Sequence, residues 1–180
     1  MGRIFDTFDT PRDPISVFLA AMDRQAVDFH PPIPGWSTIN LGAGRKHIVN
    51  SIPLDADMGW MAREPFPNIR DEEIQTIFAF HFFEHLTKEE LIATLRECER
   101  VLVCGGVINA VTPHWSAEIA HQDLDHKLFF SEQTWQNLFQ NDYYDGTMPR
   151  DWKLGVGFQM IMGLVQRNLV LLTQIVKTND

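Results

Sequence analysis

Two histidines and a glutamate lie close together in the stretch IFAFHFFEHLTKEE, residues 77–90. His81, Glu84 and His85 form the pattern H-x-x-E-H, which is typical of one class of zinc metallopeptidases. In such an enzyme the two histidines, four residues apart, both bind the metal ion. This requires their rings to lie on one face of a continuous helix. The local backbone therefore decides whether the motif is a zinc site.

The surrounding residues favour a different backbone. Thr87 and Glu90 form a capping box, T-x-x-E, which predicts that a helix begins at Thr87, after the motif. The segment IQTIFAF, residues 74–80, is β-like, and no helix N-cap separates it from His81. We therefore predict His81 at the end of a strand, with Glu84 and His85 in the turn that follows. No second motif offers a third ligand, so we predict no metal ligands and keep the zinc peptidase as a remote alternative.

The remaining segments alternate between helical and β-like patterns. The first half predicts a helix at residues 14–28, a proline-rich connector at 30–36, β runs at 37–44 and 47–57, and a loop at 64–73 before the strand at 74–80. The second half predicts a helix at 87–102, a stop signal at Cys104–Gly106, a strand at 107–113, a helix opened by Ser131, and a hairpin formed by 152–165 and 169–177.

Strand, helix and strand in alternation predict an α/β fold. We expect a Rossmann-like, doubly wound and mostly parallel sheet with an antiparallel C-terminal hairpin. The 180 residues are expected to form one domain, in which residues 1–36 are a possible lid and residues 37–180 are the core. In such sheets ligands bind at the carboxyl ends of the strands. A ligand site and ordinary polar loop residues are therefore the two main interpretations of the histidine segment.

Composition narrows the possible partners. The net charge of −9 gives no general attraction to a phosphate backbone, so we expect no duplex nucleic acid partner. The longest apolar runs are too short to cross a bilayer, and residues 1–10 do not resemble a signal peptide. The two cysteines, Cys98 and Cys104, have no metal or redox spacing. We interpret them as reduced structural thiols and expect a cytoplasmic protein of unknown oligomeric state.

Four segments in register resemble the class I S-adenosylmethionine-dependent methyltransferases, in particular the small "EHL"-type, methyltransferase type 11-like branch. INLGAG (39–44) resembles the glycine-rich first motif, and PLDAD (53–57) the acidic end of the second strand. Residues 64–86 resemble the Pro-Phe-Pro run that precedes a buried strand and H-x-x-E-H-L. RECERVLVCGGVINAVTP (96–113) resembles the helix, glycine turn and next strand. The match covers about residues 39–113.

The resemblance implies S-adenosylmethionine as the cofactor. Gly42 and Gly44 would let the backbone approach the methionine part without Cβ clashes, together with Asn40 and Ala43. Asp55 would accept the ribose hydroxyls, with Asp57 as the fallback. Phe80 and His81 would border the cofactor. His81 and His85 are candidate general bases, and His114 and His126 are candidate substrate-binding residues. For each histidine, a structural role is an open alternative.

Three positions depart from the family pattern. Asn40 stands where an acid is common, Cys104 replaces the proline before two glycines, and the crossover after Gly44 is too short for a full helix. No N-P-P-Y, D-P-P-Y or Pro-Cys motif points to a DNA base. We therefore expect methylation of an oxygen or nitrogen atom of a small molecule, sugar or metabolite. The alternative is a non-catalytic methyltransferase-like binding or structural subunit.

Overall fold

The computed structural model describes residues 37–44, 48, 50–139, 158–165 and 169–177. The predicted helix at 14–28, the possible lid at 1–36 and the turn at 166–168 lie outside these residues. The strands are β1 (Ser37–Leu41), β2 (Ile52–Leu54), β3 (Ile74–Phe80), β4 (Leu102–Pro113), β5 (Phe158–Val165) and β6 (Val170–Lys177). The helices are α3 (Lys88–Val101), α4 (Glu118–His121) and α5 (Glu132–Phe139), with short 3-10 turns η1 (Ala56–Met58) and η2 (Phe83–His85).

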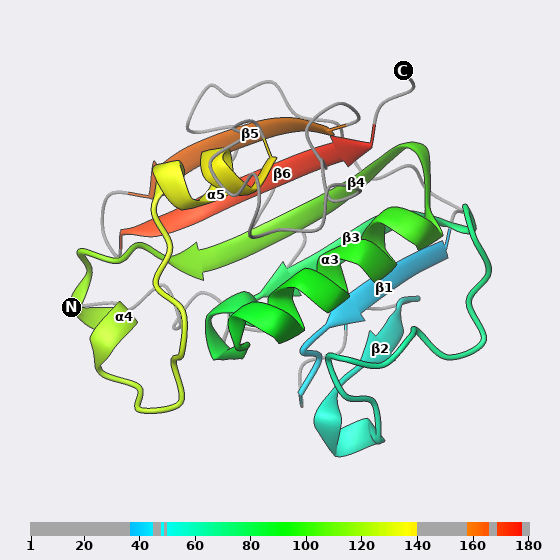
Figure 1. Ribbon diagram of the computed structural model, residues 1–180, viewed down its shortest axis with the longest axis horizontal. Helices are drawn as coiled ribbons and strands as arrows, with labels where there is room; N and C mark the ends of the chain where they lie inside the picture. The colour runs from blue at the N-terminus through cyan, green and yellow to red at the C-terminus, as the bar shows by residue number, and fades with distance from the viewer. Residues whose placement is uncertain (1–36, 45–47, 49, 140–157, 166–168, 178–180) are drawn as a thin grey trace.

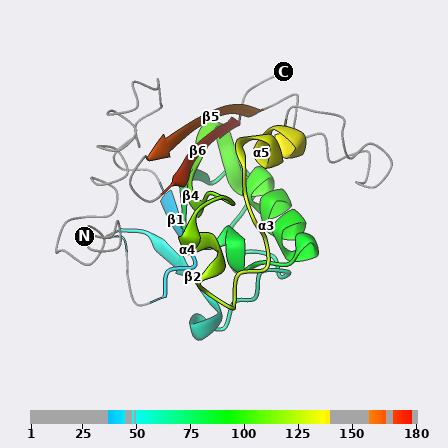
Figure 2. The same ribbon diagram turned by 90° about the vertical axis from the view of Figure 1, so that its left-hand side faces the viewer.

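The strands form one sheet in the order β2-β1-β3-β4-β6-β5. The first four strands in this order are parallel, whereas β6 is antiparallel to both β4 and β5. The predicted α/β fold, with its Rossmann-like, mostly parallel sheet and antiparallel C-terminal hairpin, is therefore confirmed. Helices α3 and α5 lie on the same face of this sheet (Figures 1 and 2). Among the described residues, no helix is both long and apolar enough to cross a bilayer.

Strand β3 lies in the interior of the sheet, and its composition explains its place. Residues 74–79 are all buried, as expected for a strand that β1 and β4 flank inside a mostly parallel sheet. Ile77 is paired with Ile39 of β1 on one side and with Ile108 of β4 on the other. All three isoleucines are at most 1% exposed. This continuous apolar strip fixes the register, and with it the positions of the residues that follow each strand.

Helix α3 begins as the sequence predicts. The Glu90 amide donates to Thr87 Oγ1 at 3.3 Å, and the Thr87 amide donates to Glu90 Oε2 at 2.7 Å, which completes the capping box. This bond from the Thr87 backbone amide lowers the pKa of Glu90. Leu91, Leu95 and Cys98 form the buried face of the helix. Burial raises the pKa of the Cys98 thiol, while Cys104 is exposed, and both cysteines are free.

Two predicted boundaries are wrong. Cys104–Gly106 is not the stop signal of the helix, because α3 ends at Val101 and its C-cap, Leu102, already has extended backbone. The three residues instead form an irregularity inside β4, where the register against β3 shifts between Leu102 and Val107. The second β run is also shorter than predicted, since only Ile52–Leu54 pair with β1.

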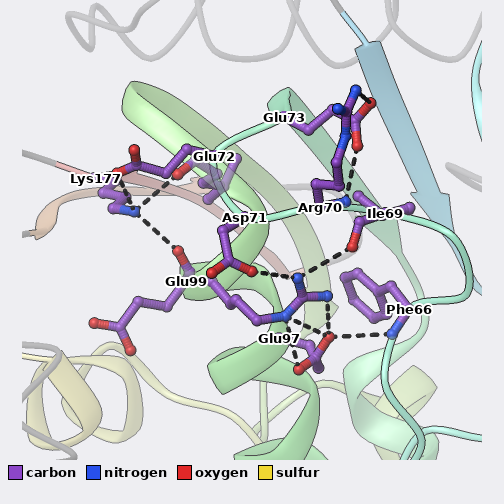
Figure 3. A network of polar contacts seen from close by, with 11 residues as sticks. Phe66, Ile69, Arg70, Asp71, Glu72, Glu73, Glu97, Glu99 and Lys177 are labelled. Carbon is purple, nitrogen blue, oxygen red and sulfur yellow. Dashed lines mark hydrogen bonds and ion pairs between the residues drawn. The ribbon is translucent and has the colours of Figure 1, made fainter.

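An ionic network stabilises the end of the sheet at which β3 begins (Figure 3). Arg100 near the end of α3 donates to Glu97 at 2.7 Å, to Asp71 at 2.7 Å and to the Ile69 carbonyl at 3.1 Å. At the same end, Lys177 of β6 donates to the carbonyls of residues 99 and 102. A cation at a helix C-terminus satisfies carbonyls that the helix leaves unpaired. Polar contacts therefore stabilise this end of the sheet. The opposite end, where the parallel strands finish, carries the candidate site.

Candidate functional site

The predicted site residues come together at one edge of the sheet. Strands β1 to β4 are parallel, so their carboxyl ends lie on the same side. The residues that follow these ends are Gly42 after β1, Asp55 after β2, His81 after β3 and His114 after β4. This is the edge at which open α/β sheets bind ligands. The sequence predicted all four residues as candidates.

The glycine turn after β1 has the backbone that its sequence predicts. Gly42 and Gly44 have φ angles of +62° and +49°, a region that glycine adopts without steric cost. The Gly42 amide donates to the Leu54 carbonyl at 2.9 Å, which joins the turn to the end of β2. A Cβ atom at Gly42 would lie 2.6 Å from Phe82 Cδ2, whereas one at Gly44 would meet no described atom within 4 Å. Among the described residues, the turn is thus closed on the Phe82 side, and no atom fills the space beside Gly44.

Asp55 holds this turn in place. Its Oδ2 atom accepts the Gly44 amide at 3.0 Å, and its Oδ1 atom accepts the Asp57 amide at 2.9 Å as the N-cap of η1. A carboxylate offers about four acceptor positions, so two such bonds leave capacity for a ligand's hydroxyl groups. Asp55 is half-buried, whereas Asp57 is exposed. Of the two acids, Asp55 is therefore the one in contact with the glycine turn.

His81 follows β3 in a backbone conformation that is uncommon for a side-chain-bearing residue. Its φ angle is +53°, and its amide donates to the Val111 carbonyl of β4 at 2.9 Å. Its ring Nδ1 lies 3.0 Å from Glu84 Oε1. Residues 83–85 form a single 3-10 turn, so no α-helix runs from His81 to His85. The helical register that a zinc peptidase of this motif needs is absent, as predicted.

The remaining predicted residues occupy distinct environments. Asn40 is 4% exposed and lies in register between Pro53 of β2 and Phe78 of β3. Ala43 is 3% exposed, which makes it part of the packing beneath the turn rather than of its open side. Phe80 is half-buried at the end of β3, with its ring 5.4 Å from the ring of Phe78.

The four candidate histidines do not form one group. His85 and His126 lie ring to ring, with centroids 4.8 Å apart and an interplanar angle of 71°. His81 is linked to this pair through Glu84, the neighbour of His85 in the chain. His114 has different ring partners, since Nδ1 lies 2.6 Å from Ser116 Oγ and Nε2 lies 3.3 Å from Glu132 Oε2.

One aromatic residue at this edge, Phe82, was not among the predicted site residues. Phe82 packs against the glycine turn, and its ring centroid lies 6.1 Å from that of the buried Trp60. Trp60 in turn contacts Phe66 at 5.4 Å in an edge-on arrangement. The only sequence signal for Phe82 is its place inside HFFEHL. Its contact with Gly42 joins segments far apart in the chain, which local patterns do not reveal.

Comparison with known proteins shows which class of fold this is. No protein-family model matches the sequence, and no curated protein matches it. Among solved structures, a SAM-dependent methyltransferase from Archaeoglobus fulgidus matches with a TM-score of 0.61 and 14% identity, over 98% of this chain and 100% of that chain. A chain of the complex between the Haloferax volcanii Trm112 methyltransferase activator and a protein described as a methyltransferase matches with a TM-score of 0.62 and 13% identity, over 98% and 94%.

A third structure, the DhpI-SAM-HEP complex, matches with a TM-score of 0.56 and 13% identity, over 96% of this chain and 90% of that chain. These matches cover nearly the whole chain at low identity. The chain therefore has the fold of the class I SAM-dependent methyltransferases, and the resemblance seen in the sequence is confirmed at the level of the fold.

Proposed function

We propose that this protein is a SAM-dependent methyltransferase whose cofactor lies over the glycine turn. The observation that carries the proposal is the bond between Gly44 and Asp55, which joins a two-glycine turn to an acid at the carboxyl edge of a parallel sheet. The open side of Gly44 gives a ligand access to the backbone, and Asp55 retains acceptor capacity. The residues present fit an adenosine-bearing ligand with a ribose diol.

Each residue has a separate role in this proposal. Gly42 and Gly44 shape the surface for the methionine part, with Ala43 packed beneath them, Asp55 accepts the ribose hydroxyls, and Phe80 borders the ligand. Asn40, which carries no charge, supports the turn from beneath. When bound, S-adenosylmethionine supplies an activated methyl group on a sulfonium centre. The protein's contribution is then mainly positioning, which can lower a barrier by roughly 7–11 kcal/mol.

His81 is our first candidate for a general base, and His85 is the second. Glu84 accepts from His81 Nδ1, so in the neutral ring the Nε2 atom carries the lone pair that can take a proton. A base is needed only when the acceptor keeps its proton until transfer. We propose an oxygen or nitrogen atom of a small molecule, sugar or metabolite as the acceptor, with His114 and His126 as candidate substrate contacts.

Calorimetric titration of the full chain with S-adenosylmethionine and S-adenosylhomocysteine tests this function. We expect one ligand per chain and a loss of about tenfold or more in affinity for Asp55→Asn, since a hydrogen bond to a charged group is worth about 1.5–3 kcal/mol. Asp57→Asn is the matched control, because Asp57 follows the same strand but is exposed. We expect its affinity to equal that of the wild type.

The outcomes separate the alternatives. No binding of either ligand at millimolar concentration would refute the methyltransferase function. Equal losses in the two variants would refute the role of Asp55. Binding without methyl transfer to any acceptor would favour the non-catalytic subunit. The structure from H. volcanii contains a methyltransferase activator, so turnover should be measured both for the chain alone and in lysate supplemented with S-adenosylmethionine.

A further inference from the structure

Three side chains that bind metals well meet beside the turn that follows β3. A carboxylate oxygen of Glu84, a ring nitrogen of His85 and a ring nitrogen of His126 all lie within 4.8 Å of one another. The first two residues belong to η2, and the third belongs to the loop after α4. Two backbone bonds hold this loop in place, because the amides of Lys127 and Leu128 donate to the Glu84 carbonyl at 2.7 and 3.1 Å. The group is therefore preorganised by the fold.

The buried carboxylate of Glu84 gives the strongest indication that a ligand binds at this cluster. Its side chain is only 1% exposed, and Oε1 is bonded to His81 Nδ1 at 3.0 Å. Its second oxygen, Oε2, is buried and has no hydrogen-bond partner among the described residues. A buried carboxylate oxygen without a partner is costly, and native proteins normally pair such atoms. A cation bound between Glu84 and the two histidines would supply the missing partner.

The hydrogen bonds and positions of the two histidine rings also favour a bound cation. His126 Nδ1 lies 2.9 Å from the Ala120 carbonyl, which can only accept, so Nδ1 carries the hydrogen. In the neutral ring Nε2 then has the free lone pair. Metal-binding histidines characteristically donate their other nitrogen to a carbonyl or carboxylate in this way. The His85 ring contacts the His126 ring edge-on, with the two ring centroids 4.8 Å apart, so both rings lie in the cluster.

We propose that Glu84, His85 and His126 bind a divalent transition-metal ion, with His81 orienting the carboxylate. Two imidazoles and one carboxylate suit zinc, and also iron or manganese, and they leave coordination positions open for water or a ligand. Ligands about 2.0–2.2 Å from a metal ion are about 3–3.5 Å apart, so atoms that lie within 4.8 Å of one another need to approach by at most about 1.3–1.8 Å.

This site differs from the peptidase motif in both ligands and backbone. His81, which that motif requires as a ligand, instead holds Glu84 from the outside, and the distant His126 provides the third ligand. The site does not depend on the cofactor. Metal binding and S-adenosylmethionine binding are therefore separate measurements, and either can fail while the other succeeds.

The test is calorimetric titration of the untagged full chain with zinc chloride after dialysis against a chelator and then against chelator-free buffer. We expect one ion per chain in the wild type. Glu84→Gln and His126→Gln should each weaken binding by at least about 100-fold, since loss of a mere outer partner already costs about 10–100-fold. The matched control is His121→Gln, which removes an exposed histidine of α4. We expect it to leave zinc affinity within about twofold of the wild type.

Two further measurements guard against misfolding. Glu84→Gln and His126→Gln should keep the circular dichroism spectrum and the cooperative urea unfolding of the wild type, whereas a variant that merely fails to fold should lose both. Zinc at about 100 times its Kd should raise the wild-type Tm by roughly 5–10 °C and leave that of Glu84→Gln unchanged. Absence of saturable one-to-one binding in the wild type would overturn the proposal, as would equal affinity in the wild type and Glu84→Gln.

Discussion

The contact between Gly42 and Phe82 gives a quantitative prediction for two neighbouring glycines. An alanine at either Gly42 or Gly44 must adopt a positive φ angle, which costs about 1–2 kcal/mol. Lower entropy of the unfolded chain returns about 0.4–1 kcal/mol. At Gly42 the new methyl group would also lie 2.6 Å from Phe82 Cδ2 and 2.9 Å from Phe82 Cβ. Such overpacking costs about 1–3 kcal/mol.

We therefore expect Gly42→Ala to lower the free energy of unfolding by about 2–3 kcal/mol, and Gly44→Ala to lower it by about 1 kcal/mol or less. Urea denaturation followed by circular dichroism measures both values, provided that the slopes of the transitions agree. Phe82 cannot easily move aside, because its ring packs against Trp60 at 6.1 Å and Phe83 at 5.5 Å.

A double-mutant cycle isolates the overlap. Phe82→Ala removes the ring atoms that the methyl group introduced by Gly42→Ala would meet, including the nearest one, Cδ2, and keeps Cβ. The double variant should therefore be more stable than the sum of the single losses predicts, by about 1–3 kcal/mol. Equal destabilisation by Gly42→Ala and Gly44→Ala would refute the reasoning. Strict additivity in the cycle would show that the Phe82 ring is not the obstacle.

Two further predictions concern thiol reactivity and pH. Burial raises the pKa of the Cys98 thiol, so iodoacetamide at neutral pH should label only the exposed Cys104 in the folded protein. In urea it should label both cysteines, and mass spectrometry counts the labels. Labelling of Cys98 in the folded state would contradict its burial. The Thr87 amide lowers the pKa of Glu90, so the stability that the charged carboxylate contributes is present above its ordinary value of 4.5 and is lost as the pH falls through the lowered value. The unfolding free energies of wild type and Glu90→Gln should differ by about 0.5–1 kcal/mol at about pH 7 and converge as the pH falls through the lowered pKa of Glu90; a gap that persists in strong acid would refute this.

Local patterns predicted those parts of the fold that depend on local interactions. The capping box placed the start of α3 at the correct residue, since its two bonds join residues three apart. The strand at 74–80 was predicted with its observed bounds, because a short apolar run rich in Ile and Phe favours a strand buried on both faces. The C-terminal hairpin was predicted from its two-residue alternation and is confirmed.

The errors arose where tertiary contacts override local preference. The pattern of Cys104–Gly106 predicts a helix stop. However, β4 already starts at Leu102, where it pairs with β3, and the two glycines lie in an irregular part of this strand. In the candidate site, too, some positions follow from local patterns and others depend on tertiary contacts. Strand ends placed Gly42, Asp55 and His81 correctly at one edge, because parallel pairing requires it.

The grouping of the histidines could not be predicted from the sequence. His126 reaches His85 only through a loop whose path is set by backbone bonds to the distant Glu84 carbonyl. The letters H-x-x-E-H suggested two histidine ligands, His81 and His85, in one segment, whereas the structure groups Glu84 and His85 with His126 from another segment. Long-range loop contacts of this kind have no periodic signature in the sequence.

The most direct test of the central claim is a crystal structure of the full chain with S-adenosylhomocysteine. We expect the ligand at the carboxyl edge of the sheet, with both ribose hydroxyls within hydrogen-bond distance of the Asp55 carboxylate and the homocysteine part over Gly42–Gly44. A ligand bound elsewhere, or a ribose that contacts Asp57 instead of Asp55, would contradict the proposed site.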